Sequence, residues 1–407
     1  MDAPSPALHA TSPSRQALRI AVVTETYPPE INGVAMTIGR LVGALRQRGH
    51  RVQLVRPRQG PGDSPENGGD FAEVLLRGIP IPRYAGLKMG LPAKSALTRL
   101  WATGRPDIVH IVTEGPLGWS ALAAARKLGI PAVTDFHTNF HAYSRHYGLG
   151  WLRRPIGAYL RGFHNRALGT MVPTEGLRRE LASHGYRNVL VVARGVDTAL
   201  FSPRQRSAEL RRSWGAGADE RVALYVGRLA PEKNLPLVIE AFAAMGARQP
   251  AAKLVLVGDG PQRASLEAKY PEHVFAGMRT GEDLAAHYAS ADIFLFPSVT
   301  ETYGNVLMEA MASGLAVVAY DYAAAAEHVV HGQSGLLAEF GNARQFIGLA
   351  ADLMAGGGIA AMGANAHRTV QAVAWEGIYD KFERILLDMA NQEGPRNAQT
   401  DLSLEPN

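Results

Sequence analysis

The chain has 407 residues, 46% of them hydrophobic and 19% charged, which is typical of a soluble globular protein with more than one domain. It contains no cysteine, which excludes disulfides, Cys-ligated metal centres and thiol catalysis. The net charge of +5 conceals an asymmetry. Residues 1–200 hold 25 Lys and Arg against 13 Asp and Glu (+12), whereas residues 201–407 hold 17 against 24 (−7). Such halves predict different partners, with an anionic one for the first half.

The composition of the basic half and of the two ends of the chain indicates which partners and which location to expect. The basic half lacks the aromatic motif of an RNA-binding sheet and the signature of a recognition helix, so we expect no nucleic-acid partner. Residues 1–17 are rich in Pro, Ser and Ala and predict a disordered leader, not a signal peptide, on a cytoplasmic protein. No apolar stretch is long enough for a transmembrane helix. The polar residues 391–407 predict a disordered tail.

From Arg19 onward, short apolar runs alternate with amphipathic stretches. Alternation at this spacing predicts a parallel sheet with helices on both faces, a Rossmann-like domain over residues 18–200. Residues 60–69 are a loop rich in Pro, Gly, Asp and Ser with no core-forming pattern. Strands are predicted at 19–25, 51–55, 107–112, 131–135 and 168–172, and helices at 34–48, 116–128, 150–167 and 174–184.

The same alternation restarts after residues 195–205 and predicts a second doubly wound α/β domain over residues 201–374. Two such domains would face each other across a cleft, with ligands at the carboxyl ends of the strands. An amphipathic helix at 375–390 is predicted to cross back to the first domain. The strands of the second domain are predicted at 222–226, 253–257, 273–276, 292–296 and 315–319.

The first chemical motif, GRLAPEKN, follows the strand at 222–226 directly and precedes a helix predicted to begin near Leu235. Arg228 and Lys233 are five residues apart at this strand-to-helix turn. Two cations at such a turn suit the two separated charges of a diphosphate. For these two residues alone, an ordinary charged surface loop is the alternative.

The second motif, ETYGNVLME, runs from Glu301 to Glu309 after the strand at 292–296. Two carboxylates eight residues apart in a helix differ by about 80° around it and lie about 12 Å apart along it, so they are not a close acid–base pair. A helix starting near Gly304 would leave Glu301 in the loop to meet sugar hydroxyls, and Glu309 to meet a ribose. The backbone N–H groups of Asn305 and Val306 would then face phosphate.

With six further stretches, these motifs resemble the retaining glycosyltransferases of family 4, which have the GT-B fold. The resemblance spans roughly residues 18–390 and is nearest to lipid-directed members, such as bacterial GDP-mannose-dependent α-mannosyltransferases and plant-type sulfolipid synthases. The further stretches are RIAVVTETYPPEINGVAMTIGRL from Arg19, DFHTNF from Asp135, VPTEGL from Val172, GVDTALFSP from Gly195, LVGDGP from Leu256 and HGQSGLLAE from His331.

The resemblance implies roles for the two motifs. Arg228 and Lys233 would bind the donor diphosphate and stabilise the leaving nucleoside diphosphate as its charge develops. Glu301 would hold hydroxyls of the transferred sugar, and Glu309 would hold the ribose. Arg228, Lys233 and Glu301, with His137, are therefore the expected catalytic residues.

Further donor-binding positions are implied in both halves. His137 would project toward the sugar and position or polarise the donor, with a structural strand-end histidine as the alternative. Gly33 would allow the backbone to approach the phosphates closely. Gly304, Asn305 and Val306 would complete the set at the start of a helix.

The implied reaction transfers a hexose, with mannose favoured over glucose, from a GDP- or UDP-linked donor to a lipid or glycan hydroxyl. The resemblance implies a front-face mechanism with retention that needs neither a metal nor a cofactor. The chain has no Asp-x-Asp triplet, which is typical of the metal–diphosphate site of the other large glycosyltransferase fold. The alternatives are a GT-B sugar–phosphate epimerase or phosphorylase and a non-catalytic nucleotide-sugar-binding protein.

Two segments bear on the donor and the acceptor. Where family members often have a glycine pair near the donor, this chain has alanines at 323–326, and alanine restricts the backbone more than glycine. Residues 145–166 combine five arginines with Trp151, Tyr159 and Phe163. They predict a basic amphipathic helix that can dock peripherally on an anionic inner membrane face. Packing of its apolar stripe on the protein's own sheet is the alternative.

Overall fold

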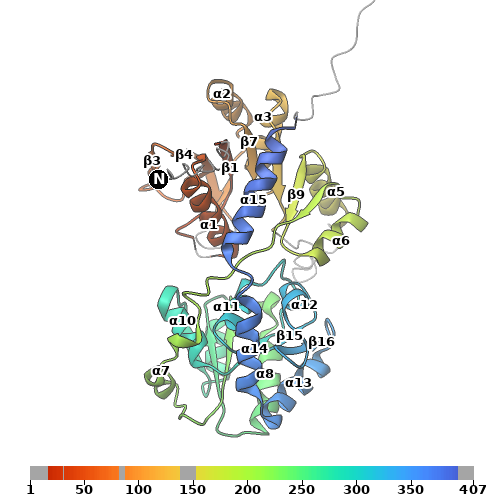
Figure 1. Ribbon diagram of the computed structural model, residues 1–407. Coiled ribbons are helices and arrows are strands. Elements are labelled where there is room, and N and C mark those ends of the chain that lie inside the picture. The colour runs from red at the N-terminus through yellow and green to blue at the C-terminus, as the bar shows by residue number, and fades with distance from the viewer. Residues whose placement is uncertain (1–16, 31, 82–87, 138–152, 393–407) are drawn as a thin grey trace, which may run out of the picture. The chain divides into compact units, whose positions relative to one another are not determined.

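The computed structural model describes residues 17–30, 32–81, 88–137 and 153–392 (Figure 1). The chain forms two compact units, one of residues 1–134 with 383–407 and the other of residues 135–382. The predicted leader, apart from Ala17, and the predicted tail from residue 393 lie outside the described residues. Each unit is built around strands that pair in parallel, as the sequence predicts.

The strands of the first unit lie in the order β8-β7-β1-β2-β4-β3. All of these pair in parallel except β3, which runs antiparallel to β4. Along the chain the strands step outward from β1 to β2 and β4 on one side, and from β7 to β8 on the other. The order therefore reverses between β1 and β7. The strands are β1 (Arg19–Val23), β2 (Arg51–Pro57), β3 (Asn67–Gly68), β4 (Phe71–Leu76), β7 (Ile108–Ile111) and β8 (Ala132–Asp135).

The helices of the first unit begin and end at residues suited to those positions. Asn32 caps α1 (Gly33–Gln47), because its Oδ1 accepts hydrogen bonds from the backbone N–H groups of Val34 and Ala35. Helix α3 (Pro116–Leu128) has proline at its first position and a left-handed Gly129 after its last. Helix α2 (Lys94–Thr103) packs against α3.

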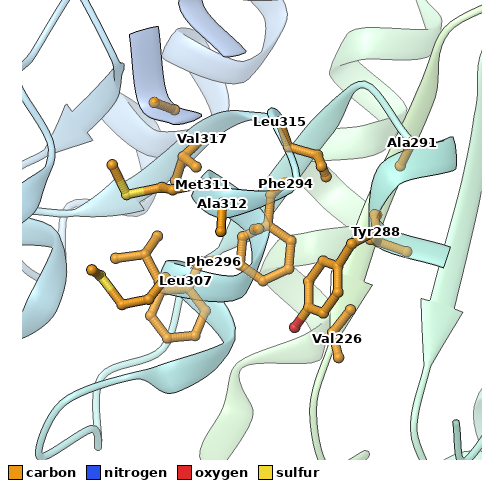
Figure 2. Close-up of a cluster of buried hydrophobic side chains, with 14 of the residues drawn as sticks. Val226, Tyr288, Ala291, Phe294, Phe296, Leu307, Met311, Ala312, Leu315 and Val317 are labelled. Carbon is orange, nitrogen blue, oxygen red and sulfur yellow. The ribbon is translucent and has the colours of Figure 1, made fainter. Parts of the chain in front are cut away.

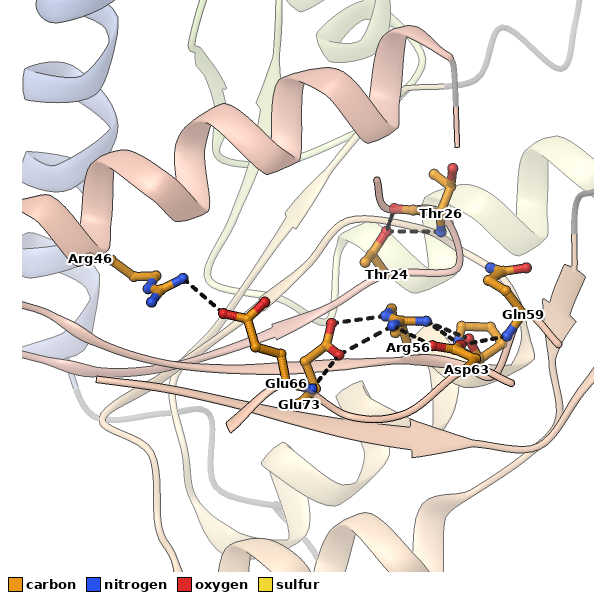
Figure 3. A network of polar contacts seen from close by, with 9 residues as sticks. Thr24, Thr26, Arg46, Arg56, Gln59, Asp63, Glu66 and Glu73 are labelled. Carbon is orange, nitrogen blue, oxygen red and sulfur yellow. Dashed lines mark hydrogen bonds and ion pairs between the residues drawn. The ribbon is translucent and has the colours of Figure 1, made fainter. Parts of the chain in front are cut away.

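The loop after β2 is anchored by a buried arginine. Arg56 donates to both carboxylate oxygens of Asp63 (2.6 and 2.9 Å) and of Glu73 (3.0 and 3.2 Å), as Figure 3 shows. Burial lowers the pKa of Arg56, but these hydrogen bonds and charges outweigh it and raise the pKa above its ordinary value. The segment predicted as a loop without core pattern is therefore fixed at Asp63, although it adds nothing to the apolar core. Two short strands that the sequence did not predict, β5 (Gly78–Pro80) and β6 (Lys88–Gly90), pair nearby in antiparallel fashion.

The second unit contains a six-stranded parallel sheet in the order β13-β12-β11-β14-β15-β16. Its strand order reverses between β11 and β14. The predicted strands at 222–226 and 253–257 have their observed bounds, and the others differ by one residue at one or both ends. The strands are β11 (Val222–Val226), β12 (Lys253–Val257), β13 (Val274–Gly277), β14 (Ile293–Phe296), β15 (Ala316–Tyr320) and the unpredicted β16 (Gly335–Ala338).

Side chains of this sheet alternate between two apolar cores. Ile293 and Leu295 of β14 face α8 (Leu235–Gly246) and α13 (Ala343–Gly356), whereas Phe294 and Phe296 face the opposite core. That second core, drawn in Figure 2, joins β14 to α10 (Gly281–Ser290), α11 (Asn305–Ala312) and α14 (Ile359–Val370). Because both faces are covered, the strands are apolar along their length, apart from Lys253 at the start of β12.

The remaining elements of the second unit include β9 (Gly169–Val172) and β10 (Val189–Val191), which pair in parallel. Helix α5 (Arg153–His164) packs its apolar stripe inward, since Leu160 joins a core with Val172 and Leu181, and Ile156 contacts it. Tyr159 is 46% exposed. The packing alternative for this stripe thus holds for Leu160 and Ile156. The part of the predicted amphipathic helix before residue 153 lies outside the described residues.

The last helix, α15 (Trp375–Ala390), has the predicted bounds, and its residues from Glu383 onward belong to the first unit. There the Glu383 carboxylate accepts hydrogen bonds from Arg48 (2.6 Å) and His50 (3.0 Å). The shorter helices of the second unit are α6 (Glu175–Ser183), α7 (Ala208–Ser213), α9 (Arg263–Lys269) and α12 (Ala324–His328).

Within the described parts of the chain, no single helix is both long and apolar enough to cross a membrane. One pair, α13 and α14, meets the length and composition for a span when taken together, but it bends by 115°.

Candidate active site

The predicted phosphate-binding cations and the first glutamate follow the two strands at which the second sheet reverses its order. Arg228 and Lys233 lie in the turn after β11, and Glu301 lies in the loop after β14. Strands β11 and β14 are neighbours, so residues almost 70 positions apart meet at one edge of the sheet. The carboxyl ends of strands at such a reversal are where open α/β sheets bind ligands.

Lys233 and Glu301 form an ion pair across this edge. The Lys233 ammonium donates to Glu301 Oε1, and the Ser298 hydroxyl donates to the same oxygen at 2.7 Å. Both charged side chains are less than one-fifth exposed, at 19% and 17%. Burial raises the pKa of Glu301, but the charge and hydrogen bond of Lys233 and the bond from Ser298 outweigh it, so the pKa lies below its ordinary value. Glu301 is therefore ionised at neutral pH.

Arg228 stands beside this pair with more exposure. Its guanidinium lies 3.4 Å from the Glu232 carboxylate, and the arginine side chain is 34% exposed while Glu232 is 1% exposed. The turn that carries both cations contains a 3₁₀ helix, Pro231–Lys233, followed by Asn234 in the left-handed conformation. The Asn234 amide donates to the carbonyl of Pro297 at 3.3 Å and so ties the two turns together. Arg228 thus keeps a cationic group in contact with solvent at the edge of the sheet.

Helix α11 begins where the second motif predicts. Gly304 precedes it with φ of 103°, and a Cβ there would lie 3.1 Å from the ring of Phe296. Only glycine meets both conditions without strain. None of the described side chains caps this end of α11, so the first-turn N–H groups, including those of Asn305 and Val306, form a partly positive helix terminus.

The two glutamates of the motif have separate surroundings. Glu309 lies inside α11, where the hydroxyl of Tyr288 donates to its Oε2 at 2.9 Å. Burial, together with Glu309, raises the pKa of Tyr288 well above its ordinary value, so it remains a neutral donor. Glu301 and Glu309 thus do not form an acid–base pair, as the spacing predicts.

His137 lies between an acid and an arginine that the sequence did not single out. Its Nε2 is 3.1 Å from Asp135 Oδ2, and its Nδ1 is 3.0 Å from Nη2 of Arg194. Arg194 is 6% exposed and also reaches Oδ1 of Asn305 at 3.4 Å. The Tyr303 hydroxyl donates to the Arg194 carbonyl at 2.7 Å. The structure thus brings His137 and Asn305 together through a residue with no motif of its own.

Two other predicted positions differ in how they sit. Gly33 is the first residue of α1 and belongs to the first unit, whereas the residues described above belong to the second unit. Ala323, where glycine is common in the family, has φ of 53° and ψ of −131°, a conformation that L-residues rarely adopt. The Ala324 N–H donates to the Tyr303 carbonyl at 2.9 Å and holds this turn against the second motif. The alanine therefore adopts a glycine-like backbone at a cost in strain.

Comparison with known proteins bears on the fold first. Two family models match, "Glycosyltransferase Family 4" over residues 31–200 and "Glycosyl transferases group 1" over residues 206–369. The sucrose-phosphate synthase structure from Thermosynechococcus elongatus superposes with a TM-score of 0.75 at 20% identity, over 91% of this chain and 99% of that one. The fold is thus that of a GT-B glycosyltransferase, with two Rossmann-like domains.

Sequence relatives define the family. A GDP-mannose-dependent alpha-mannosyltransferase from Corynebacterium glutamicum is 32% identical over 89% of this chain and 85% of its own length. An alpha-monoglucosyldiacylglycerol synthase from Streptococcus pneumoniae is 29% identical over 74% of this chain and 71% of its own. The chain belongs to the family 4 glycosyltransferases and is a hexosyltransferase. The epimerase, phosphorylase and binding-protein alternatives are not favoured.

Proposed function

We propose that this enzyme transfers mannose from GDP-mannose to a hydroxyl group of a membrane lipid, with retention of anomeric configuration and without a metal ion. The observation that carries the proposal is the Lys233–Glu301 ion pair at the edge where the second sheet reverses. The pair joins a cation, which would bind the donor phosphate, to a carboxylate, which would accept from sugar hydroxyls. The donor and acceptor classes are supported by the names of the mannosyltransferase and glycolipid synthase relatives.

Donor binding would exchange the existing contacts of the site for new ones. The diphosphate would draw Lys233 from Glu301 and would meet Arg228 and the N-terminus of α11, where anions are stabilised. Both described contacts of the Glu301 carboxylate fall on Oε1, which supports the proposal that Oε2 would accept from a sugar hydroxyl. Glu309 would accept from the ribose hydroxyls.

The chemical step would break the bond between the sugar C1 and the β-phosphate oxygen and form a bond from C1 to the acceptor oxygen. In a front-face reaction the acceptor attacks from the side that the diphosphate leaves, and its proton passes to a phosphate oxygen. Lys233 and Arg228 would stabilise the negative charge that develops on the leaving group. Among the described residues, no three His, Asp or Glu side chains are gathered so that they could hold a metal ion. Metal independence is thus part of the proposal to be tested.

The experiment compares donors, acceptors and chelation in one assay. Purified enzyme is incubated with GDP-mannose, UDP-glucose or ADP-glucose and with vesicles that contain diacylglycerol and phosphatidylinositol. Expected is GDP release with formation of an α-linked mannolipid that EDTA does not inhibit. Turnover only with UDP-glucose would overturn the donor assignment. Loss of activity in EDTA that is restored by Mg²⁺ or Mn²⁺ would overturn metal independence.

A peripheral membrane contact is proposed for the outer side of α5. Arg154 and Arg161, seven residues apart in the helix, are exposed on one side of it, while Leu160 packs inward. Exposed cations on one side of a helix suit an anionic membrane surface. Co-sedimentation with vesicles containing phosphatidylglycerol should fall in the Arg154→Glu/Arg161→Glu variant and not in Arg179→Glu, which makes the same kind of charge change on α6. Equal binding by both variants would contradict this contact.

A further inference from the structure

A buried cation next to the candidate active site has no role in the function proposed so far. Arg194 follows β10 and is 6% exposed, and no carboxylate forms an ion pair with it among the residues the structure describes. Burial lowers its pKa, and Tyr303, Asp135 and Glu301 act against this decrease from a distance. Arginine keeps its proton in proteins. Among the described residues, the side chains that contact this buried charge are His137, Asn305 and the ring of Tyr303.

The chemistry of these partners fixes where protons lie. A guanidinium has five N–H donors and no acceptor, so His137 Nδ1, 3.0 Å from Nη2, must be the acceptor. A neutral imidazole that accepts on Nδ1 carries its proton on Nε2, and His137 Nε2 is 3.1 Å from the Asp135 carboxylate. His137 is therefore the neutral Nε2–H form, with Asp135 on one side and Arg194 on the other.

The same guanidinium also acts on the start of α11. It lies 3.4 Å from Oδ1 of Asn305, the first residue of that helix. With its oxygen turned to Arg194, the Asn305 amide directs its NH₂ group elsewhere. The uncapped N-terminus and this NH₂ group then offer hydrogen-bond donors at one place.

We propose that Arg194 is a positioning residue, which holds His137 in its neutral Nε2–H form and turns the Asn305 amide so that both present a fixed polar surface to the sugar nucleotide. The functional part of this inference rests on the proposed function, because it assumes that His137 and Asn305 meet the donor. The proton arrangement itself is independent of any substrate. One side chain thus fixes the orientation of His137 and of Asn305, which are 57 and 111 positions away in the sequence.

Protonation of His137 is the consequence that distinguishes positioning from mere packing. While Arg194 is present, Nδ1 cannot take a proton without setting two donors against each other. Of the other described groups near His137, Asp135 is a carboxylate, His164 is neutral because burial lowers its pKa to about 3, and Glu301 is already ionised. Burial also raises the pKa of Tyr303 above its ordinary value. None of His164, Glu301 and Tyr303 should titrate between about pH 5 and pH 8.

The first measurement is the tautomer of His137 in the wild-type protein, read from long-range ¹H–¹⁵N spectra of histidine-labelled enzyme. The His137→Asn variant identifies the signal. An unprotonated Nδ1 and a protonated Nε2 are expected, and they should persist without substrate. His50 is an internal reference, because its Nδ1 accepts from the Leu18 N–H at 3.1 Å and its Nε2 faces Glu383. A proton on His137 Nδ1 would overturn the proposal.

The second measurement uses Arg194→Met and Arg194→Lys. Both should lower kcat by about 10²-fold through misplaced groups, while GDP binding in a thermal-shift assay changes by only a few-fold. In Arg194→Met, kcat should fall further as the pH is lowered, because a freed histidine can take up a proton, whereas the wild-type rate should not show this fall. An unchanged pH profile in a folded, active variant would contradict the proposal.

The matched control is Arg211→Met. Arg211 is 4% exposed in the same unit and donates to Ser290 O at 2.8 Å and to Asp292 Oδ2 at 3.1 Å. Its loss should lower thermal stability without a new acid limb in the rate profile. If wild-type enzyme turns over no sugar nucleotide, the proposed function fails and the tautomer result still decides the proton arrangement. An active wild type with the other tautomer refutes only this inference.

Discussion

Each of the two sheets reverses its strand order at one point, and a glutamate lies at each of these two reversal points. The pKa values of the two carboxylates are shifted in opposite directions. Between β11 and β14, Glu301 is paired with Lys233, and its pKa lies below the ordinary value. Between β1 and β7, the carboxylate of Glu25 accepts hydrogen bonds from the backbone N–H groups of Gly90 (3.3 Å) and of Leu117 in the first turn of α3. Burial raises the pKa of Glu25 to about 7.

The difference indicates which of the two glutamates could exchange its present partner for a ligand. In the proposed reaction, Glu301 would release the Lys233 ammonium to the donor diphosphate, and both groups would then contact the donor. Glu25 is bound to the main chain, and a Cβ on Gly115 would overlap its carboxylate, so it is enclosed by backbone. Similar topology thus holds a glutamate paired with a lysine side chain in one sheet and a glutamate bound to backbone N–H groups in the other.

The largest effect should follow from removal of the exchangeable cation. Lys233→Ala should lower kcat by about 10²- to 10³-fold, because charge on the leaving diphosphate is no longer stabilised. Initial rates of GDP release with GDP-mannose and lipid vesicles would measure this. Lys269→Ala, an exposed lysine of the same unit, makes the same charge change away from the site and should leave kcat unchanged. Near-normal turnover in Lys233→Ala would show that the Lys233–Glu301 pair does not differ in function from the reversal point at Glu25.

At the reversal point of the first sheet, Glu25 should make the stability of the protein depend on pH, and it should not affect substrate turnover. Burial raises the folded-state pKa of Glu25 from its ordinary value of 4.5 to about 7, so its ionisation costs stability as pH rises through this range. Glu25→Gln keeps an acceptor oxygen and should stabilise the protein by about 2–3 kcal/mol at pH 8, with no gain near pH 4.5. Urea unfolding at the two pH values measures this. Glu180→Gln, an exposed change on α6, should show no such pH dependence, and equal gains in both variants would refute it.

Neutralising the reactive carboxylate separates binding from catalysis. Glu301→Gln removes the ion-pair partner of Lys233 and a negative charge beside the diphosphate. GDP should then bind about tenfold more tightly, which corresponds to about 1.4 kcal/mol, while turnover of GDP-mannose falls. Calorimetric titration with GDP alone provides the test. Weaker GDP binding in a folded variant would show that Glu301 does not compete with the diphosphate for Lys233.

The smallest effect is expected from the strained turn at Ala323, which is hydrogen-bonded to the second motif through Ala324 and Tyr303. Ala323→Gly should raise the free energy of unfolding by about 1 kcal/mol, since glycine adopts φ of 53° and ψ of −131° without the Cβ penalty. Thermal unfolding measures the gain. Ala325→Gly, inside α12, should destabilise because it adds only backbone entropy. A loss of stability in Ala323→Gly would show that the turn relaxes with alanine in place.

The sequence predicted most elements because their apolar runs are long and regular. Helix α3 and strands β11 and β12 have the predicted bounds, and α11 begins next to Gly304. It missed β10 and β16, whose three and four residues are too few to establish a period. It also missed β3, β4 and helix α2, and the pair β5 and β6, which contain Gly and Pro.

The sequence by itself determined the order of elements, the place of Arg228 and Lys233 after one strand, and the separate surroundings of Glu301 and Glu309. Local periodicity and turn residues carry this information because each depends on neighbours along the chain. Only the tertiary structure decided that β11 lies beside β14, that Lys233 pairs with Glu301 and that Arg194 meets both His137 and Asn305. Such contacts depend on strand order and burial. Neither produces a sequence pattern near Arg194 from which its contacts could be predicted.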